Sequence, residues 1–203
     1  MITIIDYGLG NLASVKNMIK KVGGQSQISA DPAIIAEAKK LILPGVGAFG
    51  QGMNNLHDRG LVAPIKECVK TGVPLLGICL GAQLLTHSSD EAEIPGLGLV
   101  NAKTLKFDLD TRKHKVPHMG WNNIKVENDH SRLLKGFEID PRFYFVHSYF
   151  MQCESEENVL CTADYGGDFC AGVINKNVMG VQFHPEKSHV FGMNLMNNYV
   201  NDF

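Results

Sequence analysis

The sequence lacks the features of a secreted, membrane-spanning or nucleic-acid-binding protein. Nineteen Lys and Arg residues are balanced by twenty-one Asp and Glu residues, so no basic excess indicates nucleic acid as a partner. Residues 1–6 contain no basic segment and reach an acid at once, unlike a signal peptide. The longest apolar stretch, residues 73–85, is too short to span a bilayer and is interrupted by proline and glycine. We therefore expect a cytoplasmic protein that acts without membrane contact.

Patterns typical of disulfides and bound metal ions are also missing. The five cysteines are odd in number and form no C-x-x-C motif, which excludes a disulfide framework and a zinc clip as interpretations. The eight histidines are dispersed and include no H-E-x-x-H motif. We predict no resident metal and no cofactor.

The composition that is present is typical of a globular protein. The chain has 203 residues, of which 44% are hydrophobic and 20% charged. A domain of this length buries roughly 70% of the surface of its unfolded chain, which is enough for a sizeable core. Because no Pro/Ser-rich linker divides the sequence, we expect residues 1–203 to form one domain.

The first half alternates short apolar segments with helical patterns. A helix over 12–22, capped by Asn11, is expected after the first strand, and two glycines close it. The expected strands cover residues 2–5, 25–29, 40–43 and 73–78, and further helices begin near 31–32 and cover 61–70. Short strands separated by helices predict right-handed βαβ units, and therefore an α/β fold with a mainly parallel central sheet and flanking helices.

After about residue 98 the pattern changes to strands separated by turns. The segments with strand character cover residues 121–126, 143–146, 159–163, 170–174 and 178–183. The sequence therefore predicts a β-rich C-terminal half.

The sharpest chemical signal surrounds Cys79. Gly77 and Gly81 flank it in the pattern G-x-C-x-G, directly after an apolar strand and before a helical segment. Such a strand-to-helix turn is a nucleophile elbow: the glycines permit the tight turn, and the helix N-terminus favours the thiolate form of cysteine. The other four cysteines lack this setting and are interpreted as structural. The pattern indicates Cys79 as a nucleophile.

A thiolate nucleophile needs a base, and the base needs a group that orients it. The segment His184-Pro-Glu186 supplies both residue types. On an extended segment, side chains two residues apart point the same way, so Glu186 is expected to bind one imidazole nitrogen while the other faces Cys79.

Residues 45–50 match G-x-G-x-x-G after a strand, a pattern that also occurs in dinucleotide-binding proteins. The dinucleotide interpretation requires an acid at the end of the next strand, where this chain has Cys79 instead. We interpret the segment as flexible backbone close to the nucleophile, able to present an amide N–H to a tetrahedral oxyanion.

These motifs resemble the pattern of the class I glutamine amidotransferases, and within them the glutaminase subunits of imidazole glycerol phosphate synthase. The similarity extends over essentially the whole chain, and four further segments carry it: residues 44–47, 117–122, 143–149 and 182–187. The resemblance implies a flavodoxin-like sheet, and a reaction in which glutamine is hydrolysed to glutamate and ammonia by a Cys79–His184–Glu186 triad.

The resemblance also implies roles for residues that local patterns leave unassigned. Amide groups of Leu80 and, after a peptide flip, Val46 would form the oxyanion hole. The residues implied in glutamine binding are Gly47, Gln83, Glu91, Ser148 and Tyr149. The residues implied on the face that docks a partner are Asn11, Trp121, Tyr144 and Lys187. His118 and His147 are interpreted as structural.

A glutaminase domain of this length leaves no room for the site that accepts ammonia, so a second chain is expected. By resemblance it is a (β/α)₈-barrel synthase subunit that makes imidazole glycerol phosphate and an aminoimidazole carboxamide ribotide, in a heterodimer with this chain. Two alternatives remain open. One is a paralogue that serves sugar biosynthesis for surface polysaccharide, which the insertion-like segment 106–115 favours; the other is a non-catalytic binding subunit.

Overall fold

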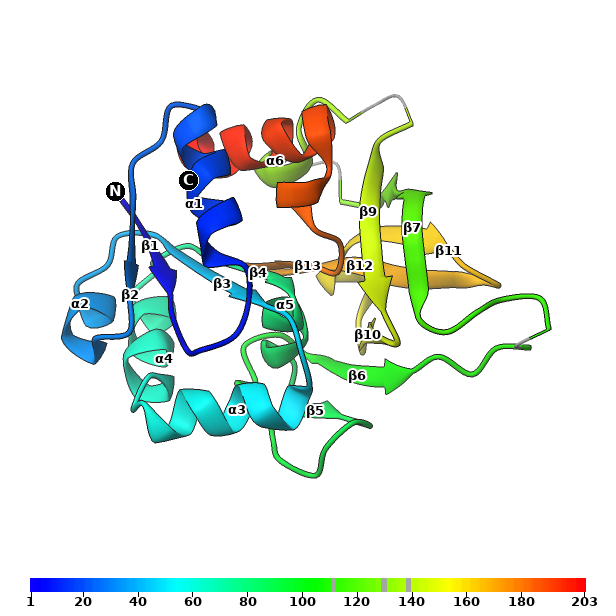
Figure 1. Cartoon of the computed structure of the whole chain (residues 1–203), viewed down its shortest axis with the longest axis horizontal. Helices are drawn as coiled ribbons and strands as arrows, with labels where there is room; N and C mark the ends of the chain where they lie inside the picture. Colours follow the sequence, from blue (N-terminus) through cyan, green and yellow to red (C-terminus); the bar gives the residue numbers. More distant parts are fainter. Residues whose placement is uncertain (111, 129–130, 138–139) are drawn as a thin grey trace.

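The computed structural model describes residues 1–110, 112–128, 131–137 and 140–203. Its main feature is one large mixed sheet with strand order β2-β1-β3-β4-β13-β12-β10-β6-β5, while β11 pairs with β12 and β8 (Figure 1). Residue 111, inside the insertion-like segment 106–115, lies outside the described part of the chain. Within that part, no helix is both long and apolar enough to cross a bilayer.

The N-terminal half forms the parallel part of this sheet. Its strands are β2 (Ser26–Ser29), β1 (Ile2–Ile5), β3 (Leu41–Gly45) and β4 (Leu75–Cys79), and β4 also pairs in parallel with β13 (Val178–Val181). The helices are α1 (Leu12–Lys21), α2 (Pro32–Ala36), α3 (Phe49–Asp58), α4 (Val62–Lys70), α5 (Leu80–Leu84) and α6 (His189–Asp202). The predicted α/β fold with a mainly parallel central sheet is confirmed.

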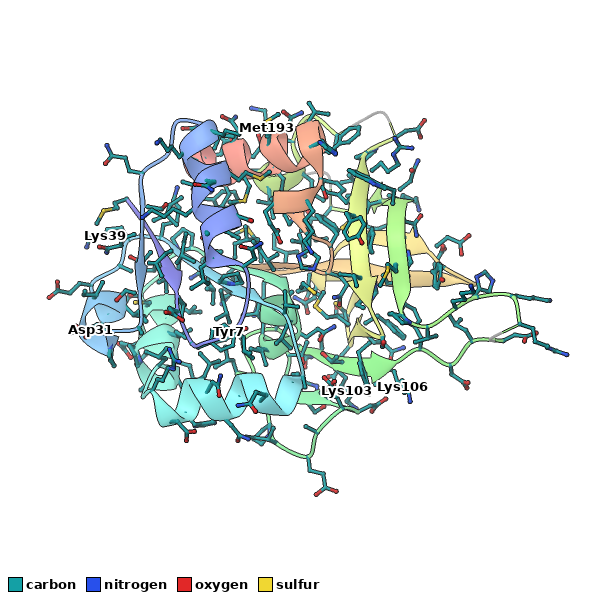
Figure 2. All side chains as sticks on the ribbon, in the orientation of Figure 1. Tyr7, Asp31, Lys39, Lys103, Lys106 and Met193 are labelled. Carbon is teal, nitrogen blue, oxygen red and sulfur yellow. The ribbon has the colours of Figure 1, made fainter. Side chains whose placement is uncertain are left out.

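Helices cover both faces of the parallel strands and form two apolar cores. Ile42 of β3 packs in the core that contains α1 and α6, whereas its neighbours Leu41 and Leu43 pack in the core that contains α2 to α5. This alternation follows from the two-residue period of a strand. Figure 2 shows the result: Tyr7 lies in the interior, while Lys39, Lys103 and Lys106 lie at the periphery.

The C-terminal half is strand-rich, as predicted. Antiparallel pairing joins β13 to β12 (Asp168–Asn175), β12 to β10 (Tyr149–Cys153), and β10 to β6 (Ala102–Lys106). The sheet is completed by β5 (Ser88–Ser89), β8 (Lys125–Val126) and β11 (Val159–Asp164), and a separate ribbon by β7 (His118–Asn123) and β9 (Arg142–His147).

The loop expected over residues 45–50 is present but shorter, and it covers residues 46–48. Gly45 ends β3, where it pairs with Cys79, and Phe49 begins α3. The helix forms because Phe49, Met53 and Leu56 recur at helical spacing and are buried together, a pattern that the glycines between them obscure. Of the two outer glycines of Gly45-Val46-Gly47, only Gly47 has a positive φ, of 131°.

Polar contacts attach the C-terminal helix α6 to the N-terminal ends of the parallel strands β3 and β4. The Tyr199 hydroxyl, which is completely buried, donates to the carbonyl oxygens of Leu41 and Pro74. The Lys40 ammonium donates to the carbonyl oxygens of Tyr199 and Val200, at 2.9 and 2.8 Å, in the last turn of the helix, where a cation is favoured. These contacts tie the C-terminal helix to the starts of β3 and β4.

We expect Tyr199→Phe to lower the free energy of unfolding by about 1–2 kcal/mol, because two buried carbonyl groups lose a donor. The control is Tyr165→Phe, whose hydroxyl donates to Lys115 O at an exposed site and which should change stability much less. Urea unfolding monitored by circular dichroism measures both. An equal loss of unfolding free energy in the two variants would show that the hydrogen bonds of the Tyr199 hydroxyl are not an important source of stability.

Candidate active site

Cys79 lies where strand β4 turns directly into helix α5. Its backbone has φ 54° and ψ −113°, a conformation that L-residues rarely adopt and that is stored as strain at functional sites. Leu80, the next residue, begins the helix, so the thiol lies at the end of a buried parallel strand and the start of a helix. The predicted elbow is therefore present.

The flanking glycines are required by close backbone packing. A Cβ atom on Gly81 would lie 1.8 Å from the carbonyl oxygen of Leu43, and one on Gly77 would lie 2.7 Å from Cα of Ala82. Both contacts are with backbone, which cannot move aside as a flexible side chain would. The turn that presents Cys79 thus depends on these two positions having no side chain.

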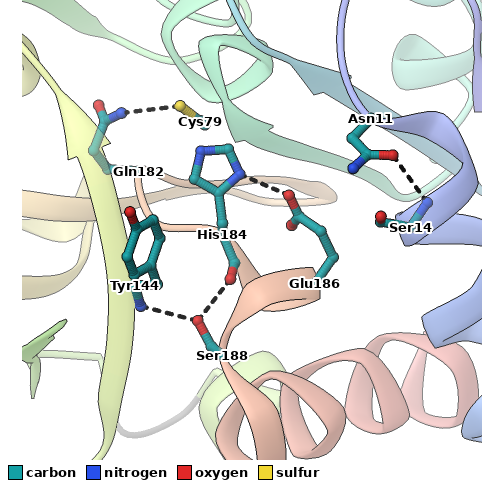
Figure 3. A network of polar contacts seen from close by, with 8 residues as sticks. All are labelled: Asn11, Ser14, Cys79, Tyr144, Gln182, His184, Glu186 and Ser188. Carbon is teal, nitrogen blue, oxygen red and sulfur yellow. Dashed lines mark hydrogen bonds and ion pairs between the residues drawn. The ribbon is translucent and has the colours of Figure 1, made fainter. Parts of the chain in front are cut away.

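The segment that follows β13 places His184 and Glu186 beside this turn. Strand β13 pairs with β4 in register, Gly180 opposite Gly77, so the chain leaves the sheet next to Cys79. The amide of His184 donates to the carbonyl oxygen of Tyr144, at 2.9 Å. Nδ1 of His184 and Oε1 of Glu186 are 2.7 Å apart, and both side chains are almost completely buried (Figure 3).

The expected geometry of this pair is wrong in one respect. Residues 185–187 form a 3₁₀ turn rather than an extended segment, and the turn brings the Glu186 carboxylate back to the imidazole. Proline at the first position of the turn favours this conformation because its φ is already set.

The electrostatic environment keeps His184 charged. Burial lowers the pKa of its imidazole, but the interactions with the Cys79 sulfur and the Glu186 carboxylate outweigh burial and raise the pKa to about 9. Among the described residues, the buried Nε2 makes no well-aligned hydrogen bond, so the sulfur acts on it by proximity. Catalytic hydrogen bonds are often long before a substrate binds.

A cavity of about 250 Å³ opens onto Cys79. All of the implied oxyanion-hole and glutamine-binding residues line it, and Pro117, Val146 and His147 are further lining residues that the sequence did not suggest. The implied residues are Val46, Gly47, Leu80, Gln83, Glu91, Ser148 and Tyr149. Oε2 of Glu91 accepts from the amide of Phe49, at 2.8 Å, at the start of α3.

His147 belongs to a buried chain of hydrogen bonds whose direction can be assigned. Its Nδ1 lies 2.7 Å from the carbonyl oxygen of Tyr149, which can only accept, so Nδ1 carries the proton. Nε2 therefore accepts from Nδ1 of His118 at 3.1 Å, and Nε2 of His118 faces the Asn122 amide at 3.4 Å. Burial lowers the pKa of both rings, to about 4 for His118 and about 3 for His147. Both are neutral and hold the cavity wall, in line with the structural role expected.

The implied docking residues lie outside the cavity. Trp121, which is 44% exposed, packs edge-on against Tyr144 at a centroid distance of 6.2 Å, and the Lys187 ammonium lies 5.6 Å from the Tyr144 ring centre. Asn11 caps α1, accepting from the amide of Ser14 at 3.2 Å, as predicted. Across the described residues, no group of three His, Cys, Asp or Glu side chains is arranged to hold a metal ion.

The neutral histidines make the protein sensitive to acid. In the unfolded chain a histidine has a pKa near 6.5, so it is protonated below that pH. In the folded protein His147 stays neutral there, because its pKa is lower. The stability that this ring contributes is present above pH 6.5 and is lost as the pH falls toward 3.

We expect His147→Asn, whose amide can still donate to Tyr149, to lose less stability than the wild type between pH 6.5 and 4.5 in urea unfolding. An exposed control, His57→Gln on α3, should follow the wild type, and an unchanged slope for His147→Asn would contradict the assignment.

Comparison with known proteins gives the family. The model described as "Glutamine amidotransferase class-I" matches residues 3–202. The chain is 52% identical to "Imidazole glycerol phosphate synthase subunit HisH 2" of Methanococcus maripaludis, over 98% of each chain. It is 48% identical to the protein of the same name from Pseudomonas aeruginosa, again over 98% of each. It is 46% identical to "Imidazole glycerol phosphate synthase subunit HisH" of Sulfurimonas denitrificans, over 98% of this chain and 97% of that one.

Solved structures agree with this at the level of the fold. The structure of PurLQS from Thermotoga maritima has a TM-score of 0.78 at 20% identity, covering 99% of this chain and 97% of that one. A glutamine amidotransferase from the same organism has a TM-score of 0.65 at 16% identity, covering 91% of this chain and 75% of that one. Together with the sequence matches along nearly the whole length, this shows that the chain belongs to the class I glutamine amidotransferase family, in agreement with the resemblance of its motifs.

Proposed function

We propose that this chain hydrolyses L-glutamine to glutamate and ammonia, with Cys79 as nucleophile, His184 as general acid and base, and Glu186 as the group that orients His184. The observation that carries the proposal is the position of the strained Cys79 elbow: it opens onto the cavity lined by the residues implied in glutamine binding, and the buried His184–Glu186 pair lies beside its sulfur. A thiolate beside an imidazolium is the state in which a cysteine attacks an amide.

The reaction then follows from the charges at rest. The Cys79 thiolate attacks the side-chain amide carbon of glutamine, and the amides of Leu80 and Val46 stabilise the oxyanion. His184, held protonated, gives its proton to the departing nitrogen, which leaves as ammonia while a γ-glutamyl thioester remains on Cys79. His184 next removes a proton from a water molecule that attacks the thioester. Collapse of this second tetrahedral intermediate releases glutamate and restores the thiolate and the imidazolium.

The cavity wall suggests how glutamine is held. The Glu91 carboxylate suits the α-ammonium group or the amide hydrogens of an amino acid, and it lines the same cavity as the backbone of Ser148 and Tyr149. Its bond to the amide of Phe49 holds this carboxylate in a single position. We propose that Gly47, Gln83, Glu91, Ser148 and Tyr149 form the glutamine site.

We further propose that the ammonia passes to a separate synthase subunit. The relatives from M. maripaludis, P. aeruginosa and S. denitrificans are named as subunits of imidazole glycerol phosphate synthase, which supports a heterodimer acting in histidine biosynthesis. In this proposal the partner is a (β/α)₈ barrel that makes imidazole glycerol phosphate and aminoimidazole carboxamide ribotide. The exposed cluster of Trp121, Tyr144 and Lys187, with Asn11, forms the docking face.

One observation favours a second candidate. The relatives from M. maripaludis and P. aeruginosa are both numbered HisH 2, which distinguishes them from another HisH. This chain would then be a paralogous glutaminase whose partner aminates a sugar precursor of surface polysaccharide. Affinity purification of the tagged chain from its own organism distinguishes the two, because the bound synthase and its gene neighbours belong to one pathway or the other.

For the Cys79→Ala variant we expect glutamate release to fall by about 10⁴ or more, because no nucleophile remains. Synthesis by the complex with its partner should persist when ammonium salt replaces glutamine, since the acceptor chemistry lies on the other chain. The control is Cys68→Ala, which removes a buried thiol of α4 and should leave glutamate release intact. Glutaminase activity that survives in Cys79→Ala would exclude the thiol mechanism, and a wild type that releases no glutamate would favour a non-catalytic binding subunit.

For Glu186→Gln we expect a smaller loss of turnover than for His184→Ala, because the base is still present. The neutral amide no longer supports the imidazolium, so the pKa of His184 should fall and the alkaline limit of activity should move to lower pH. Rates measured from about pH 6 to about pH 10, together with melting temperatures, test both points. Equal and complete loss in both variants, with normal melting, would assign Glu186 a direct role.

A further inference from the structure

Gln182 is a polar side chain at the nucleophile for which the triad has no role. It follows β13 directly and is completely buried. Its Nε2 lies 3.8 Å from the sulfur of Cys79, within hydrogen-bonding range for sulfur (Figure 3). The sulfur therefore has two neighbours that can donate, the His184 imidazolium and the Gln182 amide.

Both donors come from the short segment that leaves β13. Gln182 and His184 are two residues apart there, and the side chains of both reach the sulfur of Cys79. Phe183, between them, points the other way and stacks on Phe143 at a centroid distance of 4.0 Å. The buried aromatic pair thus fixes the orientation of the segment and directs the residues on either side of Phe183 toward Cys79.

The direction of the Gln182 amide follows from the groups around it. Nε2 of Gln83 lies 3.0 Å from the carbonyl oxygen of Tyr149, which can only accept a hydrogen bond. The same nitrogen lies 3.0 Å from the Gln182 side chain, so the atom that Gln182 presents to it is the acceptor oxygen, Oε1. The NH₂ group of Gln182 must therefore face the sulfur. The Tyr149 carbonyl thus fixes the orientation of the Gln83 amide, and the Gln83 amide fixes that of Gln182.

We propose that Gln182 is a further catalytic residue, whose side-chain amide donates a hydrogen bond to the Cys79 sulfur and holds it as an oriented thiolate. This inference rests on the proposed role of Cys79 as nucleophile. A thiolate accepts hydrogen bonds more strongly than a thiol, so a donor that is fixed in place favours the ionised form. Because Gln182 is neutral, it provides this support without competing with His184 for protons.

Several titratable groups lie around the sulfur. His184 faces it from the segment after β13, and the completely buried Tyr7 lies near it from the end of β1. Glu91 and His147 line the same cavity, the latter neutral at ordinary pH. Substituting Gln182 leaves all four in place, so a change in the pH dependence of thiol reactivity reports the loss of the Gln182 side-chain amide.

The test is the rate at which iodoacetamide alkylates Cys79, followed by peptide mass spectrometry from about pH 5 to about pH 10. In Gln182→Met, which keeps the length of the side chain but removes the donor, the rate at pH 7 should fall about threefold to tenfold, as expected for one hydrogen bond. The pH midpoint should also rise. The matched control is Gln152→Met at an exposed position of β10, which should behave like the wild type. An unchanged rate and midpoint in a Gln182→Met protein of normal melting temperature would overturn the proposal.

A measurement on the wild-type chain covers the case in which the variant does not fold. With ¹⁵N-labelled glutamine, the side-chain amide signals of Gln182 should shift with the same pH midpoint as the alkylation of Cys79. If no glutamine side-chain amide follows that midpoint, the proposal is wrong. If Cys79 is not a nucleophile at all, the result is different: iodoacetamide would alkylate Cys79 of the wild type no faster than Cys153, a half-buried cysteine of β10.

Discussion

The active site depends on one packing constraint, the contact of helix α5 with the backbone of strands β3 and β4. Gly81 lies so close to the Leu43 carbonyl, and Gly77 so close to Ala82, that neither position has room for a methyl group. The chain can make this contact only by turning sharply at Cys79, which takes the positive φ. The strain at Cys79 is maintained by the burial of apolar side chains from β3, β4 and α5 in one core, and the turn leaves the thiol at the start of a helix.

Three buried histidines near this turn show how their neighbours set their charge. Burial disfavours the imidazolium of each. His184 has a carboxylate at 2.7 Å and a sulfur beside it, so it stays protonated at neutral pH. The hydrogen-bond partners of His147 and His118 among the described residues are each other, a backbone carbonyl and an amide, none of them a carboxylate, so both rings are neutral and each fills one donor and one acceptor position. The same residue type is therefore charged beside Cys79 and uncharged in the hydrogen-bonded pair of His147 and His118.

The sequence predicts best what a short pattern encodes. The G-x-C-x-G turn, the alternation of strands and helices and the Asn11 cap are local features, and the structure confirms all three. The conformation of residues 184–186 was predicted wrongly, and the loop over residues 45–50 was predicted too long, because tertiary packing sets the 3₁₀ turn and the start of α3. Helix α6 has apolar residues on more than one face, so its four buried positions do not stand out in the sequence. The place of Gln182 beside Cys79 depends on a contact between β13 and β4 that no local pattern contains.

The pairing of β13 with β4 has a consequence for how such a chain can change over time. Cys79 ends β4, and His184 comes three residues after the end of β13, the parallel neighbour of β4, although almost the whole antiparallel region lies between them in sequence. Their separation is therefore set by backbone hydrogen bonds and not by the length of the intervening chain. Loops between β5 and β12 can gain or lose residues without moving the catalytic pair. The surface formed by these loops can therefore change in sequence, so that the same hydrolytic centre can serve different partner subunits.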